Sequence, residues 1–290
     1  MDELRWTADN QFTAGLDRPI LVVAFSGFFD AAGSATSAVD WLAERLDSMQ
    51  VGDVDPETFF DFTQERPVVE FDEHDVRGIR WASNRVLAVR TAEGQRDLVL
   101  VSGIEPHLRW RTFTEALLEA TTRSGSRLVV TLGSMSGMSP HTRPPAVTGS
   151  STNRGLADRL GLDRPSYQGP TGVVGVLHDT LDRAGIPVIS LRVSVPYYLP
   201  DSPNPKATRA LLRRFEQVSG IDTAHADLDG PAAEWQSRVD LAVAGDAEVR
   251  AHVRRLESQV DQSEDLLARG DDLAAELEAF LREQDAPPDA

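Results

Sequence analysis

Hydrophobic and polar residues follow one another along the chain in blocks that predict strands and helices in turn. Residues 18–28, RPILVVAFSGF, hold six consecutive apolar residues before Ser26 and Gly27, a pattern typical of a buried strand. Residues 30–49 show helical spacing, with Asp30 placed to cap the helix and apolar residues at Ala35, Val39, Leu42 and Leu46. A strand, a glycine turn and a helix form one half of a parallel α/β unit.

The same alternation continues to about residue 221. Residues 66–104 predict three strands joined by turns, and residues 108–125 predict a helix that ends at Gly125. The later elements expected are a strand in 127–133, helices in 154–162 and 169–187, a strand in 188–198 and a helix in 204–221. This order favours a largely parallel sheet with helices on both faces.

From about residue 222 onward the pattern is purely helical. We expect two or three amphipathic helices, interrupted near Gly245-Asp246 and Gly270-Asp271. Their apolar stripe would consist of Leu256, Val260, Leu267, Leu273, Leu277 and Leu281. The last six residues, DAPPDA, are expected to be disordered. We therefore divide the chain into an α/β domain, 1–221, and a C-terminal helical extension, 222–290.

Charge and composition exclude several classes of protein. Acidic residues outnumber basic ones 46 to 29, which gives a net charge of -17 and argues against nucleic acid as a partner. No apolar run approaches the ~20 residues of a membrane span, and the acidic N-terminus is unlike a secretory signal. There is no cysteine, so disulfides and thiolate chemistry are excluded. We expect a cytoplasmic protein that binds no membrane.

Polar residues follow one expected strand at the edge where open α/β sheets bind ligands. In SGIEPHLRWRTF, residues 102–113, Glu105 and His107 could transfer protons, and Arg109 could clamp an anion. Alternatively, Glu105 and Pro106 begin the next helix, whose dipole favours an acid there. Both readings remain open from the sequence.

The loop TLGSMSGMSPHTRPPAVTGS, residues 131–150, carries two further candidates, His141 and Arg143. Serine and histidine in one loop do not make a catalytic triad. GSMSG is not a nucleophile elbow, because Met135 stands where the serine would be. The loop is longer than a plain connection requires, so we expect either a ligand site or an interface.

Glycine-rich helix starts provide the remaining candidates. Thr171 and the amides near Gly172 could bind an anion, or the glycines could serve close helix packing. Asp30 at the first helix start is a candidate acid or base. No dinucleotide or P-loop motif is present, and Lys206 is the only lysine. The six histidines lack metal-site spacing, so we expect no metal and no cofactor, and we assign no catalytic residue.

Several blocks in order resemble the proteasome assembly chaperone 2 family in its bacterial, actinobacterial branch. They cover roughly residues 18–220 and read PILVVAFSGFFDAAGSATSAVDWL, DPETFFDFTQERPVVEF, LVLVSGIEPHLRWRTF, VVTLGSMSGMSPHTRPPAVTGSS, GPTGVVGVLHDTLDRAGIPVISL and VPYYLPDSPNPKATRALLRRF. The resemblance implies a three-layer α/β/α fold of the phosphorylase/hydrolase-like type with a helical C-terminal extension. It also implies assembly with copies or relatives of the chain, a trimer being one candidate.

The resemblance suggests a function and also shows one departure from the family. Eukaryotic members hold proteasome α subunits during ring assembly, and archaeal relatives dock through a C-terminal hydrophobic-tyrosine-any tail. This chain ends in PPDA, which argues against docking of that kind. We therefore expect a self-associating, non-catalytic chaperone whose partners can include proteasome subunits. The alternative is an enzyme or a small-anion or nucleotide binder that uses the strand-end loops.

Overall fold

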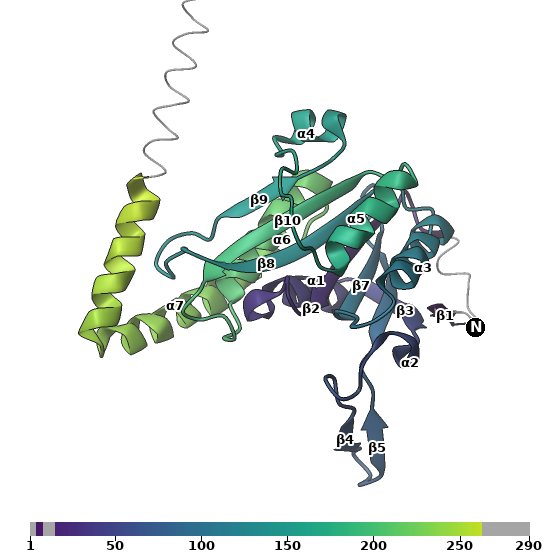
Figure 1. Cartoon of the computed structure of the whole chain (residues 1–290), viewed down its shortest axis with the longest axis horizontal. Coiled ribbons are helices and arrows are strands. Elements are labelled where there is room, and N and C mark those ends of the chain that lie inside the picture. Colours follow the sequence, from purple (N-terminus) through teal and green to yellow (C-terminus); the bar gives the residue numbers. More distant parts are fainter. Residues whose placement is uncertain (1–3, 8–14, 263–290) are drawn as a thin grey trace, which may run out of the picture.

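The computed structural model describes residues 4–7 and 15–262, which build an eight-stranded sheet with helices on both faces (Figure 1). Across the sheet the strands are β1 (Leu4–Trp6), β3 (Asp47–Val54), β6 (Asn84–Arg90), β7 (Leu98–Ile104), β2 (Ile20–Ser26), β8 (Val129–Gly137), β10 (Val188–Pro196) and β9 (Val147–Ser150). The four central strands, β7, β2, β8 and β10, are parallel to one another, and antiparallel strands extend the sheet at both edges. The predicted α/β/α fold is confirmed.

Two helices cover each face of the parallel strands. On one face lie α1 (Ser34–Arg45) and α6 (Pro205–Ser219), and on the other lie α3 (Trp110–Arg123) and α5 (Val173–Arg183). The continuous apolar run of β2 follows from this arrangement, because successive side chains enter opposite cores. Ile20, Val22 and Ala24 pack with α1 and α6, whereas Leu21, Val23 and Phe25 pack with α3 and α5.

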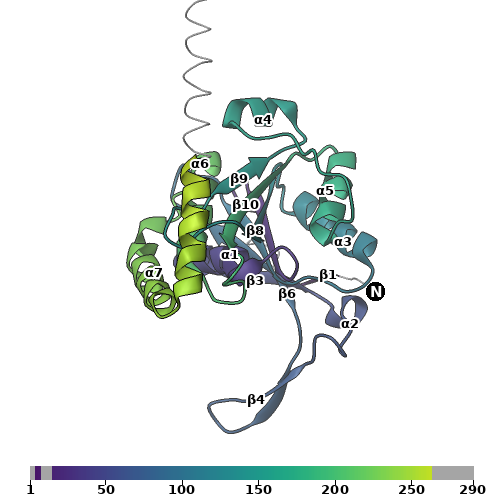
Figure 2. The ribbon, with the colours of Figure 1, turned by 60° about the vertical axis from the view of Figure 1, so that its left-hand side comes forward.

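A separate two-stranded hairpin projects from the body between β3 and β6 (Figure 2). It consists of β4 (Val68–Phe71) and β5 (Arg77–Arg80). The expectation of three strands in residues 66–104 was wrong, because the middle one is broken at 81–83. Its first part, β5, belongs to the hairpin, and its second part, β6, belongs to the main sheet.

The sequence patterns missed several short or exposed elements. These are β1, β3, β9 and the one-turn helix α2 (Pro56–Phe59). The first half of β3 is exposed and, apart from Met49, polar, so it shows no alternation of apolar residues. The other expected helices are present, among them the short α4 (Arg154–Leu160), and β8 continues to Gly137, four residues beyond the expected end.

The C-terminal residues are helical as expected. Helix α7 (Asp229–Ala244) packs on α6, and after Gly245-Asp246 a second helix covers residues 247–262. Leu256 of the expected apolar stripe is buried, whereas 267–281, the second interruption and the terminal DAPPDA lie outside the described residues. The main core includes Leu228, so it continues past residue 221, and the domain division stays a prediction. Among the described helices, none has the length and apolar character to cross a membrane.

Candidate functional site

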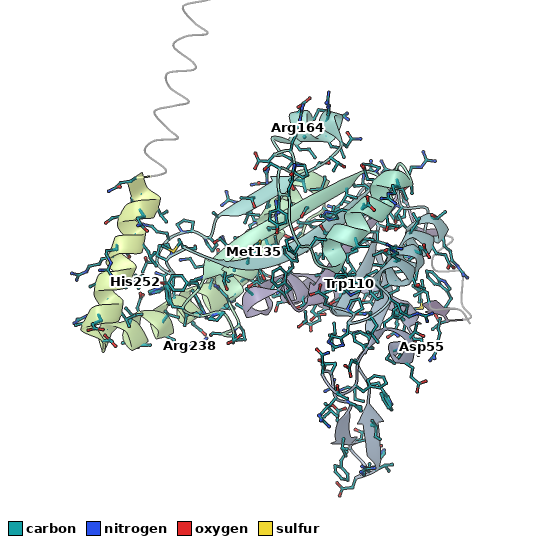
Figure 3. The ribbon with its side chains drawn as sticks, in the orientation of Figure 1. Asp55, Trp110, Met135, Arg164, Arg238 and His252 are labelled. Carbon is teal, nitrogen blue, oxygen red and sulfur yellow. The ribbon has the colours of Figure 1, made fainter. Side chains whose placement is uncertain are left out.

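A cavity of about 710 Å³ opens at the carboxyl ends of β2 and β7, beside the start of α5. Four of the residues singled out from the sequence line it, namely Glu105, His107, Thr171 and Gly172. Trp110, at the start of α3, contributes an aromatic wall, and Figure 3 places it above the root of the hairpin. This is the position at which open α/β sheets bind ligands.

Glu105 fastens two backbone segments at the cavity. Its Oε2 accepts a hydrogen bond from the Phe28 amide at 2.9 Å, and its Oε1 accepts one from the Val173 amide at 3.2 Å. A Cβ at Gly27 or Gly172 would lie within 2.8 Å of the Glu105 side chain. Gly27, with φ of 150°, requires glycine, whereas a side chain at Gly172 would displace the carboxylate. The acid therefore sits at the start of α5, where the helix dipole favours it, and it orders the turn after β2.

His107 fixes the position of the loop at 61–65, which forms the wall of the cavity on the side of the hairpin. Its Nδ1 accepts a hydrogen bond from the Asp61 amide at 3.2 Å, which leaves the ring proton on Nε2 in the neutral form. The ring also packs edge-on against Phe60, with centroids 5.8 Å apart. Hydrogen bonds from Thr63 are the main reason why the pKa of Asp61 lies below its usual value. These contacts give His107 a structural role and leave Nε2 for a ligand.

Arg109 does not line this cavity. It is exposed and adopts a left-handed conformation, with φ of 55°, at the N-cap of α3. Among the described residues that line the cavity, none is arginine or lysine, while Glu65 and Glu105 contribute carboxylates. Within the described ranges no group of three metal-ligating side chains is placed to hold an ion. The charges at this site therefore disfavour an anion.

Asp30 lies outside the cavity, buried between α1 and β8. Its carboxylate accepts hydrogen bonds from the amides of Ala35 and Thr36, from the Thr36 hydroxyl and from Ser134 Oγ. Asp30 therefore bonds the free amides of the first turn of α1, as a cap would, although Gly33 occupies the N-cap position. Burial raises the pKa of Asp30, although the hydrogen bonds oppose that shift.

His141 and Arg143 join the loop after β8 to the C-terminal helices. The buried His141 ring bonds Tyr198 Oη at 2.7 Å through Nδ1 and Asp240 Oδ1 at 3.0 Å through Nε2. Arg143 donates to both carboxylate oxygens of Asp261 at 2.8 Å. This loop is therefore an internal interface, which was one of the two roles expected from its length.

The candidate residues thus belong to separate places in the molecule. Figure 3 shows Trp110, at the cavity, well separated from His252, on the helix that Arg143 holds. Sequence reasoning missed Gln64 and Glu65, which line the cavity from the segment before the hairpin, because no element was predicted there. Phe28 was also missed. The only feature of the sequence that could have pointed to Phe28 as a cavity residue is its position, since it is an apolar residue directly after the glycine turn and outside the strand.

Comparison with known proteins identifies the family. The model of the PAC2 family matches residues 24–243. A PAC2 family protein from Streptomyces avermitilis is 40% identical, with a TM-score of 0.76 over 81% of this chain and 99% of that chain. The Mycobacterium tuberculosis proteasome-assembly chaperone homologue Rv2125 is 36% identical, with a TM-score of 0.73 over the same 81% and 99%.

A further structure, a protein of unknown function from Corynebacterium glutamicum, is 25% identical, with a TM-score of 0.81 over 91% of this chain and 98% of that chain. No curated protein matches the chain significantly. The matched segment includes the end of β2, the other parallel strands, the cavity and most of α7. On this evidence the chain belongs to the PAC2 family.

Proposed function

We propose that the protein is a self-associating, chaperone-like protein of the cytoplasm that binds other chains, proteasome subunits among them, and performs no catalysis. The family and the 36% identity to a proteasome-assembly chaperone homologue support the chaperone role. Internal hydrogen bonds also occupy Asp30, Glu105 and His141, which were candidates for chemistry.

The observation that carries the proposal is the β4–β5 hairpin, which has one apolar face and one face with an ion pair. In the β4–β5 register Val69 lies opposite Ile79, and Phe71 follows on the same face, since alternate residues share a face. These three side chains are 47%, 50% and 64% exposed. The opposite face carries Val68 and the Glu70–Arg80 ion pair. An isolated two-stranded sheet is barely stable in water, so this apolar face favours a protein partner.

A second copy of the chain is the first partner that we propose, with a trimer as one candidate assembly. Two bodies that each carry a net charge of -17 repel one another. The six residues from 66 to 71 would span roughly 20 Å when extended, which is more than the Debye length of about 8 Å at physiological salt. The β4–β5 hairpin, residues 68–80, can therefore act as an arm that contacts a second copy while the bodies of the two molecules stay apart.

Self-association is tested with variants of the two hairpin faces. The double variant Val69→Ser, Phe71→Ser should dissociate the oligomer in sedimentation-velocity experiments, because it removes apolar contact area. Val68→Ser is the matched control, since Val68 is 45% exposed on the other face of the same strand. Equal dissociation by both variants, or a monomeric wild-type protein, would contradict the proposed arm contact.

Proteasome binding is tested by pull-down of core α and β subunits with the full-length chain, followed by native gels of proteasome assembly. We expect α subunits to be retained and the yield of assembled core particle to rise when the chain is present. Absence of both effects would remove the proteasome role but would leave self-association standing.

The second candidate function is the binding of a small ligand in the strand-end cavity. It is favoured by the cavity volume of about 710 Å³ and by the position of His107 on its wall. The two carboxylates suit a neutral or cationic group better than the anion expected from the sequence. Native mass spectrometry of gently purified protein should then show a retained mass, which His107→Ala should abolish and the exposed-site control His74→Ala should not.

A further inference from the structure

A second cavity, of about 750 Å³, lies at the amino ends of the parallel strands, where β2, β8 and β10 begin. The strand-end cavity described above lies at their carboxyl ends. Helix α4, which Figures 1 and 2 show set apart at one end of the molecule, forms one of its walls. Four arginines line it, contributed by four separate segments of the chain: Arg18, Arg96, Arg127 and Arg159. None of the described residues that line it is acidic. In a chain with 46 acidic and 29 basic residues, this is a marked local excess of positive charge.

Three of the four arginines bond to other groups of the chain, and donors remain for a ligand. Arg18, which pairs with Asp17, accepts through its backbone carbonyl a 3.3 Å hydrogen bond from Arg96 Nη1. Arg159 uses Nε to bond the Gly155 carbonyl at 2.8 Å, which leaves its terminal nitrogens for other partners. Arg127 makes no hydrogen bond or ion pair within residues 4–7 and 15–262. Guanidinium groups match the geometry of phosphate and carboxylate oxygens in pairs of hydrogen bonds.

The rest of the lining is largely apolar. Leu156 and Leu160 lie one turn apart on α4, and Leu128 and Val218 contribute from the start of β8 and from the end of α6. Apolar walls with a few charged groups are typical of small-molecule sites, and the volume is in the range of such sites. A purely inorganic anion would leave these walls in contact with water, so the ligand should also have a hydrocarbon part.

We propose that this cavity binds a small amphipathic anion, whose phosphate or carboxylate head contacts the arginines and whose hydrocarbon part covers the walls formed by α4, α6 and the strand starts. The site is separate from the strand-end cavity and from the hairpin, because the lining residues are different. Binding there would attach a metabolite or lipid-derived anion to the face opposite the strand-end cavity.

Calorimetric titration of the full chain with octyl phosphate and with octanoate tests this site and distinguishes the two head groups. We expect saturable binding of at least one, at a single site, that weakens as salt rises. Inorganic phosphate tests the anionic head group without the hydrocarbon part, and octyl glucoside tests the octyl group without the anionic head. Both should bind at least tenfold more weakly, since each lacks half of the proposed contacts.

Variants locate the binding. Arg127→Ala and Arg159→Ala should each weaken octyl phosphate binding about tenfold, because each removes charge-assisted hydrogen bonds. Both side chains are exposed, so the fold should tolerate the changes, which circular dichroism checks. Arg238→Ala on α7, which Figure 3 shows away from α4, is the control of equal charge. No binding of either amphipathic anion at millimolar concentration, or equal weakening by all three variants, would overturn the proposal.

Discussion

His178 shows at the residue scale how burial sets a charge state. The ring lies on α5 against β8, with Nε2 2.8 Å from Thr131 Oγ1. Burial, assisted by the charge of Arg192, lowers its pKa from 6.5 to about 4. The histidine is therefore neutral at physiological pH.

We predict that His178 makes the fold sensitive to acid. Between pH 6.5 and 4 the unfolded chain binds this proton and the folded chain does not, so stability falls as pH falls through that window. The loss is up to about 3 kcal/mol. Urea unfolding at pH 7 and pH 4.5 measures it. His178→Gln should reduce the difference between the two pH values, whereas His74→Gln, at an exposed site, should leave it unchanged.

Asp30 gives a second prediction at this scale. Asp30→Ala removes the hydrogen bonds donated by the amides of Ala35 and Thr36 and by the hydroxyls of Thr36 and Ser134. It should cost about 2 to 3 kcal/mol of unfolding free energy at pH 7. The exposed Asp201→Ala should cost little. Because the folded pKa is raised, the folded state holds the proton more tightly, so this group's contribution to stability declines as pH rises above the ordinary carboxyl pKa of 3.8. Asp30→Asn should abolish that decline; an unchanged pH profile would contradict the burial argument.

Capping by Asp30 could be predicted from the sequence, because a cap and its amides are neighbours in the chain. The partner Ser134 could not be predicted, since it lies 104 residues away and the two meet only when β8 lies beside β2. The same reason applies to Glu105, whose sequence context suggested the start of α3. Its carboxylate in fact binds the amide at the start of α5.

At the element scale, the loop after β8 holds the C-terminal helices to the body. Tyr198 and Asp240 bond His141, and the same loop reaches the 247–262 helix through Arg143 and Thr142. Lys206, the only lysine in the chain, donates to the His141 carbonyl at 2.7 Å. Long polar loops in sequence suggest a site, but only the fold shows that the partner is the chain itself.

We predict that Arg143→Ala loosens the 247–262 helix selectively, because it breaks the paired hydrogen bonds to Asp261. Hydrogen exchange should accelerate in residues 247–262 and stay unchanged in β2 and β8. Arg250→Ala, which removes an exposed arginine from that same helix, is the control. If exchange rose equally in the sheet, the contact would support the whole fold and not the extension alone.

Patterns of apolar residues predicted the buried elements and failed for the exposed ones. The strands β2, β8 and β10 and helices α1, α3, α5 and α6 have faces in the two cores, which impose their periodicity. In contrast, every residue of β5 is exposed and none belongs to either core, so nothing in the sequence separated β5 from β6.

At the scale of the whole molecule, the net charge of -17 opposes assembly while the apolar arm favours it. We predict that self-association strengthens as sodium chloride rises from about 50 to 500 mM, because screening weakens repulsion and leaves burial of apolar surface. Sedimentation equilibrium at both salt concentrations measures the change. A weaker association at high salt would indicate that ion pairs, and not the arm's apolar face, join the copies.

The way the arm is inserted has a consequence for divergence within the family. It interrupts the chain between β3 and β6, yet these two strands pair directly with each other in the main sheet. A longer, shorter or altered arm therefore leaves every strand pairing of the body in place, and added loop length costs little free energy. If the hairpin binds partners as proposed, substitutions in it can change the partner without altering the strand pairing of the main sheet.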